Sequence, residues 1–143
     1  MIVLDANILL YAYDTESPLH HKSKAWLERT LSGGGLIGMP WQTIGAFLRI
    51  ATNTKLSGDR FSSSEACDIV EGWLAVPNLV LLQPTDHFWK LLRETIITGQ
   101  AQGPLITDAQ LAAITINYGA TLATTDRDFA RFPGLRWLNP LAP

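Results

Sequence analysis

Three aspartates of this 143-residue chain stand where their carboxylates could act together. Asp5 directly follows a short apolar run, Ile2–Leu4, and Asp126 comes just after another, residues 121–124. Asp108 stands near the start of the most apolar long segment of the chain. Residues that follow parallel strands gather at the carboxyl edge of a sheet, where α/β proteins bind their ligands. If the two runs are neighbouring parallel strands, we therefore expect these three acids to converge.

Three carboxylates at one place favour a metal site. Like charges that gather in a crevice repel one another unless a cation or a proton compensates them. The chain has one cysteine and three histidines, and carboxylate oxygens are the donors that Mg²⁺ and Mn²⁺ prefer. Such an ion activates water for the hydrolysis of phosphodiesters. Taken singly, each aspartate could instead cap a helix, form a turn or complement a helix dipole.

The elements that would position these acids alternate along the chain. Five short apolar runs are expected to be strands: Ile2–Leu4, 36–39, Leu79–Leu82, 121–124 and 135–138. Helices are expected over residues 8–13 and 17–31, from Pro40, from the capping box of Ser62 and Glu65, from Thr85 to about Gly99, and over Leu105–Asn117 with Thr107 as its N-cap. This alternation predicts an α/β fold with a largely parallel sheet in one domain, residues 1–143.

The composition narrows the class of protein. Hydrophobic residues make up 47% and charged residues 17%, which argues against a disordered chain. The formal net charge of −2 argues against a polycation that holds nucleic acid by bulk charge, and the single Cys67 excludes a disulfide framework. No apolar run approaches the ~20 residues that span a bilayer, and the N-terminus lacks the positive region of a signal peptide. We expect a soluble, cytoplasmic protein.

Five segments of the chain resemble one family. Three are similar to PIN-domain proteins: Val3-Leu4-Asp5-Ala6-Asn7, Leu105-Ile106-Thr107-Asp108-Ala109-Gln110-Leu111-Ala112-Ala113 and Ala123-Thr124-Thr125-Asp126-Arg127-Asp128-Phe129. Two more resemble the VapC-type ribonuclease toxins of bacterial toxin–antitoxin pairs: Pro40-Trp41 with Phe47-Leu48-Arg49, and Phe132-Pro133-Gly134-Leu135-Arg136-Trp137. The resemblance implies a three-layer α/β PIN fold and a Mg²⁺- or Mn²⁺-dependent endoribonuclease. It also implies RNA as substrate, a VapB-type antitoxin as partner, and a homodimer.

The resemblance assigns roles by position. Asp5 and Asp108 would bind the metal directly, and Asp126 would complete the catalytic cluster through the metal or a water molecule. Asn7 and Thr125 stand where the family places supporting polar groups. The three aspartates would therefore be both the metal ligands and the catalytic residues.

Arginines and one further acid could border this site. Arg127 and Arg131 could hold RNA phosphates, as could Arg136, although Arg127 could equally pair with a neighbouring aspartate. Arg49 could contact the substrate or an antitoxin carboxylate, or it could complement the end of its helix. Asp128 could point to the same mouth or cap the next helical turn, and we favour the cap.

One position departs from the family pattern. PIN nucleases place a glutamate in the helix after the second strand, and the matching residue here is Ala46. A helical wheel puts Trp41, Ile44, Leu48 and Ala51 toward the core and Gln42, Ala46, Arg49 and Asn53 on the opposite face. We therefore expect a site that depends on Asp5, Asp108 and Asp126 alone, with weaker metal binding or one ion in place of two.

Two other functions remain open. A PIN fold weakened at Ala46 could act by binding RNA or a protein partner, although the intact set of three acids favours catalysis. A HAD-like phosphohydrolase also has an aspartate just after its first strand. That chemistry needs a second acid two residues later, where this chain has Asn7, so we rank it last.

The chain is rich in tryptophan, with five in 143 residues. Four of them fall on apolar faces of the expected helices: Trp26, Trp41, Trp73 and Trp89. We expect these side chains to pack in the core or in an oligomer contact and not to stack on nucleobases.

Overall fold

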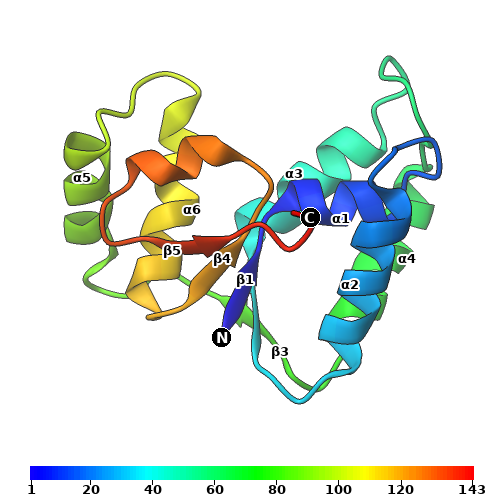
Figure 1. Cartoon of the computed structure of the whole chain (residues 1–143), viewed down its shortest axis with the longest axis horizontal. Coiled ribbons are helices and arrows are strands. Elements are labelled where there is room, and N and C mark those ends of the chain that lie inside the picture. Colours follow the sequence, from blue (N-terminus) through cyan, green and yellow to red (C-terminus); the bar gives the residue numbers. More distant parts are fainter.

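The computed structural model describes residues 1–143 and has a parallel sheet between two layers of helices (Figure 1). The strand order is β3-β2-β1-β4-β5, and every neighbouring pair is parallel. The strands are β1 (Ile2–Leu4), β2 (Ile37–Pro40), β3 (Leu79–Leu82), β4 (Thr121–Ala123) and β5 (Arg136–Leu138). The predicted three-layer α/β fold is confirmed, and the sheet is parallel throughout.

Helices from the two halves of the chain cover opposite faces of the sheet. In Figure 1 the earlier four lie to one side of β1 and the later two lie to the other. The earlier helices are α1 (Ala6–Ala12), α2 (His20–Ser32), α3 (Trp41–Ala51) and α4 (Ser63–Leu74). The later ones are α5 (Phe88–Thr98) and α6 (Leu105–Asn117), followed by a short 3-10 helix, η1 (Arg127–Arg131). None of these helices has the length and apolar character needed to cross a bilayer.

The sheet separates two hydrophobic cores because successive residues of a strand point to opposite faces. Val3 and Leu122 pack with α5 and α6 in one core, and their chain neighbours Leu4 and Ala123 pack with the earlier helices in the other. All four side chains are fully buried. The two central strands are therefore fixed from both sides, which holds their carboxyl ends in place.

Of two predicted helix caps, one is confirmed and the other is wrong. The capping box is confirmed at α4, where Glu65 N donates to Ser62 Oγ (3.1 Å) and Ser62 N donates to Glu65 Oε1 (2.9 Å). The prediction of Thr107 as N-cap of α6 is wrong, because that helix already begins at Leu105 with Pro104 as its cap. The fixed φ of proline suits a helix start, and Thr107 and Asp108 consequently lie within the first turn.

Two other helices begin later than predicted because the expected caps make different bonds. Ser17 Oγ accepts a hydrogen bond from Leu19 N (3.2 Å) in a turn, and α2 starts only at His20. Thr85 Oγ1 donates to Asn117 Oδ1 (2.9 Å) at the end of α6, and α5 starts at Phe88.

The tryptophans divide between core and surface. Trp73 is buried as predicted, with its ring centroid 4.7 Å from that of Phe47, and its Nε1 donates to the Tyr13 hydroxyl (3.1 Å). Trp41 and Trp89 are 50% and 67% exposed, so neither is in the core, and an oligomer contact at these two residues stays a prediction. Trp41 is the first residue of α3 and stands at the carboxyl edge of the sheet, and Trp89 lies on the exposed side of α5.

Candidate active site

The site starts from the pairing of the two central strands. Leu4 of β1 lies beside Ala123 of β4, and Asp5 N donates to Ala123 O (3.1 Å). The residues that follow these strands, Asp5 and Thr124, are therefore neighbours at the carboxyl edge of the sheet. Asp5 also stands at the N-cap position of α1, where its side chain makes no capping bond and is available to the site.

A buried threonine connects the polar groups at this edge. Thr124 Oγ1 donates to Asp5 Oδ2 (2.6 Å) and accepts from Asp126 N (3.0 Å) and from Asn7 Nδ2 (3.3 Å). Thr124 is fully buried. The sequence reasoning assigned the supporting role to the next residue, Thr125, because residue type does not distinguish the two. The strand register does distinguish them, and it places Thr124 against Asp5.

Asp108 lies beside Asp5 but belongs to α6, which packs in the core on the other face of the sheet. It lies in the first turn of α6 and lines a small hollow of about 60 Å³ together with Asp5, Gln42 and Thr107. Gln42 Nε2 donates to Thr107 O (3.2 Å), which ties the start of α3 to the start of α6. Ala46 lines this hollow as well, so the alanine at the usual glutamate position faces Asp5 and Asp108.

The third acid, Asp126, also stabilises the start of a short helix. Asp126 precedes η1, and its Oδ1 accepts from Asp128 N (2.8 Å), so Asp126 is the residue that caps this helix. The preferred interpretation of Asp128 as the cap is therefore wrong, because the helix begins at Arg127, two residues earlier than that interpretation requires. Asp128 is exposed in the first turn of η1.

Burial and mutual repulsion disfavour ionisation of the acids in the hollow. Burial, followed by repulsion from Asp126, Asp5 and Asp128, raises the pKa of Asp108 to about 6, against an opposing effect of Arg131. Burial also raises the pKa of Asp5, with a smaller contribution from Asp126, and the Thr124 hydrogen bond opposes this increase. The carboxylates are thus close enough to repel one another, and a cation among them would lower their free energy.

The donor set fits a hard divalent cation. The polar side chains among the lining residues carry carboxylate, amide and hydroxyl oxygens, and the lining includes no histidine or cysteine. Asn7 Oδ1 is buried and has no hydrogen-bond partner, so this part of the site offers an acceptor for a donor such as a bound water molecule. The oxygens of Asp5, Asp108 and Asp126 do not all lie within 4.8 Å of one another.

A separate acidic cluster was missed from the sequence. One carboxylate oxygen each from Asp14, Glu16 and Asp59 lies within 4.8 Å of the other two. Backbone N–H groups already bind these acids: Asp14 Oδ1 accepts from Glu16 N and Asp59 N (both 3.1 Å), and Asp59 Oδ2 accepts from Thr15 N (2.9 Å). These bonds join the loop after α1 to the loop after α3. The cluster lies at the opposite end of α1 from Asp5, roughly 10 Å away along the helix axis.

The arginines occupy different parts of the surface. Arg131 is close enough to Asp108 to lower its pKa, and its guanidinium donates to Gly99 O (3.2 Å). Arg127 and Arg49 are exposed on η1 and α3. Arg136 begins β5 and donates to the carbonyl oxygen of Gly119, so it lies at the amino edge of the sheet, opposite to the aspartates. The expectation that Arg136 borders the site is therefore wrong.

Comparisons with known proteins agree on the family. The model of the PIN domain matches residues 2–135, and the chain belongs to the PIN-domain family. Its relatives include Ribonuclease VapC37 of Mycobacterium tuberculosis, which is 37% identical over 142 residues and 99% of both chains. VapC ribonuclease Mb2897 of Mycobacterium bovis is 33% identical over 99% of this chain and 96% of its own length.

Solved structures support the fold. VapBC2 from Rickettsia felis, bound to a DNA fragment from its promoter, contains a chain that matches with a TM-score of 0.72 and 19% identity, over 97% of this chain and 98% of that chain. VapC20 of Mycobacterium tuberculosis, described as a toxin that cleaves the sarcin-ricin loop, matches with a TM-score of 0.68 and 14% identity, over 95% and 99%. These likenesses agree with the three-layer architecture and the parallel sheet.

Proposed function

We propose that this protein is a metal-dependent endoribonuclease and the toxin of a VapBC-type pair. The observation that carries the proposal is the hollow shared by Asp5 and Asp108, in which burial and neighbouring carboxylates raise the pKa of Asp108 to about 6. Carboxylates alone would repel the phosphates of RNA, so a substrate phosphate can approach them only with a cation between. The full-length relatives named VapC ribonucleases support the activity and the class of substrate.

Each residue has a distinct task in this proposal. Asp5 and Asp108 would hold a Mg²⁺ or Mn²⁺ ion directly, and Asp126 would act on it directly or through water. When bound, the ion supplies the acidity that activates water and offsets charge on the phosphate in the transition state. Thr124 fixes the carboxylate of Asp5, and Asn7 holds Thr124 in turn. Thr125 and Asp128 stay candidates for supporting contacts at the rim.

A VapB-type antitoxin is the proposed protein partner, supported by structural neighbours that are described as VapBC complexes. An antitoxin would silence the site by covering the hollow or by offering it a competing charged group. We also propose that the protein forms a homodimer and acts in the cytoplasm, where a ribonuclease meets its RNA. Sedimentation of the purified chain, alone and with the protein encoded beside it, tests both assemblies.

Cleavage of a structured RNA pool by the purified protein tests the enzymatic part. We expect products in Mn²⁺ or Mg²⁺ and none in EDTA or with Asp108→Asn. Asp68→Asn is the matched control, because Asp68 is an exposed acid on α4. Equal cleavage by wild type and Asp108→Asn would indicate a contaminating nuclease and contradict the proposal.

A second candidate, an RNA- or protein-binding module without strong catalysis, is not favoured by the relatives named ribonucleases, but Ala46 makes it worth testing. The alanine lines the hollow where PIN nucleases place a glutamate, so the site has one carboxylate fewer. Folded wild-type protein that binds RNA in Mg²⁺ but does not cleave any RNA of the pool would favour this candidate. Cleavage that depends on Asp108 would exclude it.

A further inference from the structure

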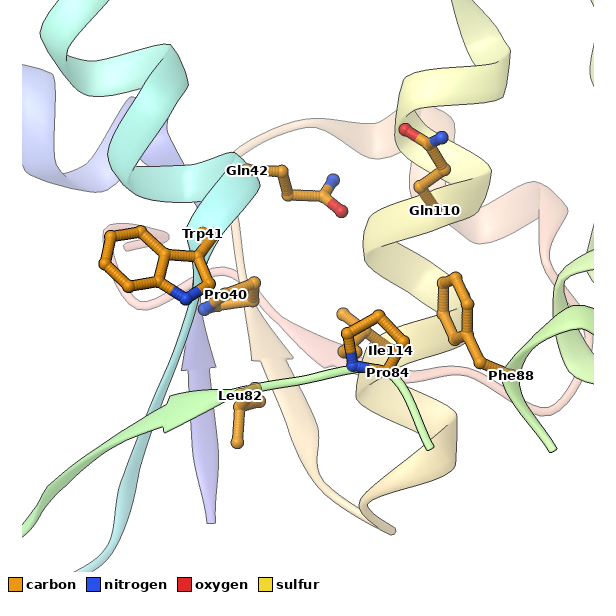
Figure 2. A pocket seen from close by; sticks show the side chains of 8 residues that line it. All are labelled: Pro40, Trp41, Gln42, Leu82, Pro84, Phe88, Gln110 and Ile114. Carbon is orange, nitrogen blue, oxygen red and sulfur yellow. The ribbon is translucent and has the colours of Figure 1, made fainter. Parts of the chain in front are cut away.

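A second hollow opens directly beside the aspartates (Figure 2). It has a volume of about 280 Å³ and lies between the ends of β2 and β3, the start of α3, and the facing sides of α5 and α6. Gln42 lines both hollows, and its Nε2 donates to the carbonyl of Thr107, the residue before Asp108. A single amide side chain therefore stands between this second hollow and the acidic one.

The lining of the second hollow is uncharged and has two chemical characters. Apolar surface comes from Pro40 and Trp41 on one side and from Phe88 and Ile114 on the other (Figure 2). The lining has two side-chain amides on opposite sides of the opening: Gln42 on α3 extends toward α6, and Gln110 lies along α6 (Figure 2). Without lysine or arginine, this hollow does not suit a phosphate. It suits a flat, neutral group with hydrogen-bonding edges.

We propose that this hollow, here called the amide pocket (Trp41, Gln42, Phe88 and Gln110), binds one unpaired nucleobase of the RNA beside the phosphate that is cleaved. The inference rests on the proposed ribonuclease function. Aromatic side chains stack on the faces of single-stranded bases, and amides bind their edges through both a donor and an acceptor. A phosphate held at the aspartates brings its own flanking base to the adjoining hollow.

The amides distinguish a base from an apolar side chain of a protein partner. An apolar occupant would remove water from Gln42 and Gln110 without replacing its hydrogen bonds, which is unfavourable. A base replaces those bonds, and its ring covers the half-exposed indole of Trp41, which is 50% exposed. The amide pocket thus makes the enzyme prefer certain nucleotides at one position next to the cut.

Binding of short RNAs separates this inference from the catalytic one. All variants carry the background substitution Asp108→Asn, which blocks cleavage, and are measured in Mg²⁺. The probes are fluorescent RNA octamers of adenylate, cytidylate or uridylate, and a pool of random-sequence octamers. Trp41→Ala and Gln110→Ala are the test variants. The matched controls are Trp89→Ala and Gln102→Ala, which remove an exposed tryptophan and an exposed glutamine elsewhere. Thermal unfolding checks that every variant is folded.

We expect Trp41→Ala to weaken binding by about 5- to 150-fold, the range for loss of one base–aromatic stack, and Trp41→Phe to restore most of it. Gln110→Ala should change the order of preference among the three octamers, and both controls should bind like the background protein. Competition by free nucleosides distinguishes a bound base from a bound phosphate.

Unchanged binding in both test variants would overturn the amide pocket and leave the ribonuclease proposal intact. Absence of RNA binding by the background protein and by wild type in Ca²⁺ would overturn both. A change of oligomeric state with Trp41→Ala, without a change in RNA affinity, would identify the hollow as a contact between protein chains and also overturn the inference.

Discussion

Thr124 Oγ1 lies 2.6 Å from Asp5 Oδ2, although 119 residues separate the two in the chain. The pairing of β1 with β4 brings them together, and the bond holds the Asp5 carboxylate against its tendency to be neutral in a buried place. Because the same hydroxyl accepts from Asn7 and from the backbone of Asp126, one buried oxygen connects the segment after β1 with the segment after β4.

Replacing Thr124 tests whether this hydroxyl organises the site. Thr124→Val keeps the shape of the side chain and removes the hydroxyl, which leaves the Asp5 carboxylate without its donor and Asn7 without its acceptor. We expect a loss of about 1–3 kcal/mol in unfolding free energy, the range for buried polar groups left unpaired, and weaker metal binding. Denaturant unfolding and Mn²⁺ titration measure the two effects. Thr125→Val is the control, and an equal loss there would return the supporting role to Thr125.

The raised pKa of Asp108, about 6, predicts how stability depends on pH in the absence of metal. An aspartate in the unfolded chain titrates near 3.9, so between about pH 4 and pH 6 the folded protein binds more protons than the unfolded one. Stability should therefore fall as the pH rises through this window. In EDTA at pH 7, Asp108→Asn should melt at a higher temperature than wild type, and the difference should vanish near pH 3.

Adding Mg²⁺ at pH 7 should reverse the order of the two melting temperatures, so that wild type melts above Asp108→Asn. The ion compensates the carboxylates of the wild-type hollow, so its melting temperature should rise more than that of Asp108→Asn. Asp68→Asn should behave like wild type in both conditions. An Asp108→Asn protein that melts below wild type in EDTA would show that repulsion at Asp108 is not the dominant effect.

Ala46→Glu restores the acid that PIN nucleases place in this helix. The new carboxylate would face Asp5 and Asp108 across the hollow, so we expect Mn²⁺ to bind at least about fivefold more tightly, since one more nearby charge is worth about 1 kcal/mol or more. Calorimetric titration measures the affinity, and the same titration gives the number of ions bound. Gly45→Glu adds the same charge at an exposed neighbouring position and should leave Mn²⁺ affinity unchanged.

Arg131 should contribute to RNA binding, because it is close enough to Asp108 to affect its pKa and is exposed to solvent. Arg131→Gln should weaken binding and reduce the slope of log affinity against log salt by about 0.7, the value for one contact to a single strand. Arg136→Gln provides the comparison at the opposite edge of the sheet. Equal slopes for wild type and Arg131→Gln would exclude a phosphate contact.

Short-range patterns predicted most elements correctly. The strand Ile2–Leu4, the capping box at Ser62 and the helix Leu105–Asn117 were all identified from residues adjacent in sequence. One error came where a tertiary contact competes with a local one. Thr85 forms a hydrogen bond with Asn117 on α6 and does not cap α5, and no periodicity in the sequence indicates that bond.

The sequence was enough to predict which acids lie together, but not which threonine contacts them. Acids after two strands and at a helix start indicated one crevice, which is the place where the structure puts Asp5 and Asp108. The choice between Thr124 and Thr125 depends on how two distant strands pair, which the sequence does not specify. Trp41 was assigned to the core because its spacing fits an apolar stripe, but no element covers the first residue of α3.

Because β1 lies between β2 and β4 in the sheet, the site at its carboxyl end forms only after both neighbouring strands have been made. β1 is translated before the other four strands, and one of its two neighbours, β4, is translated only after β2 and β3. A growing chain therefore holds Asp5 on a strand with one open edge, without Asp108, Thr124 or Asp126 beside it. The acidic site forms only after β4 and Asp126 have been translated, so the shorter chains that precede this stage on a ribosome do not carry the complete site.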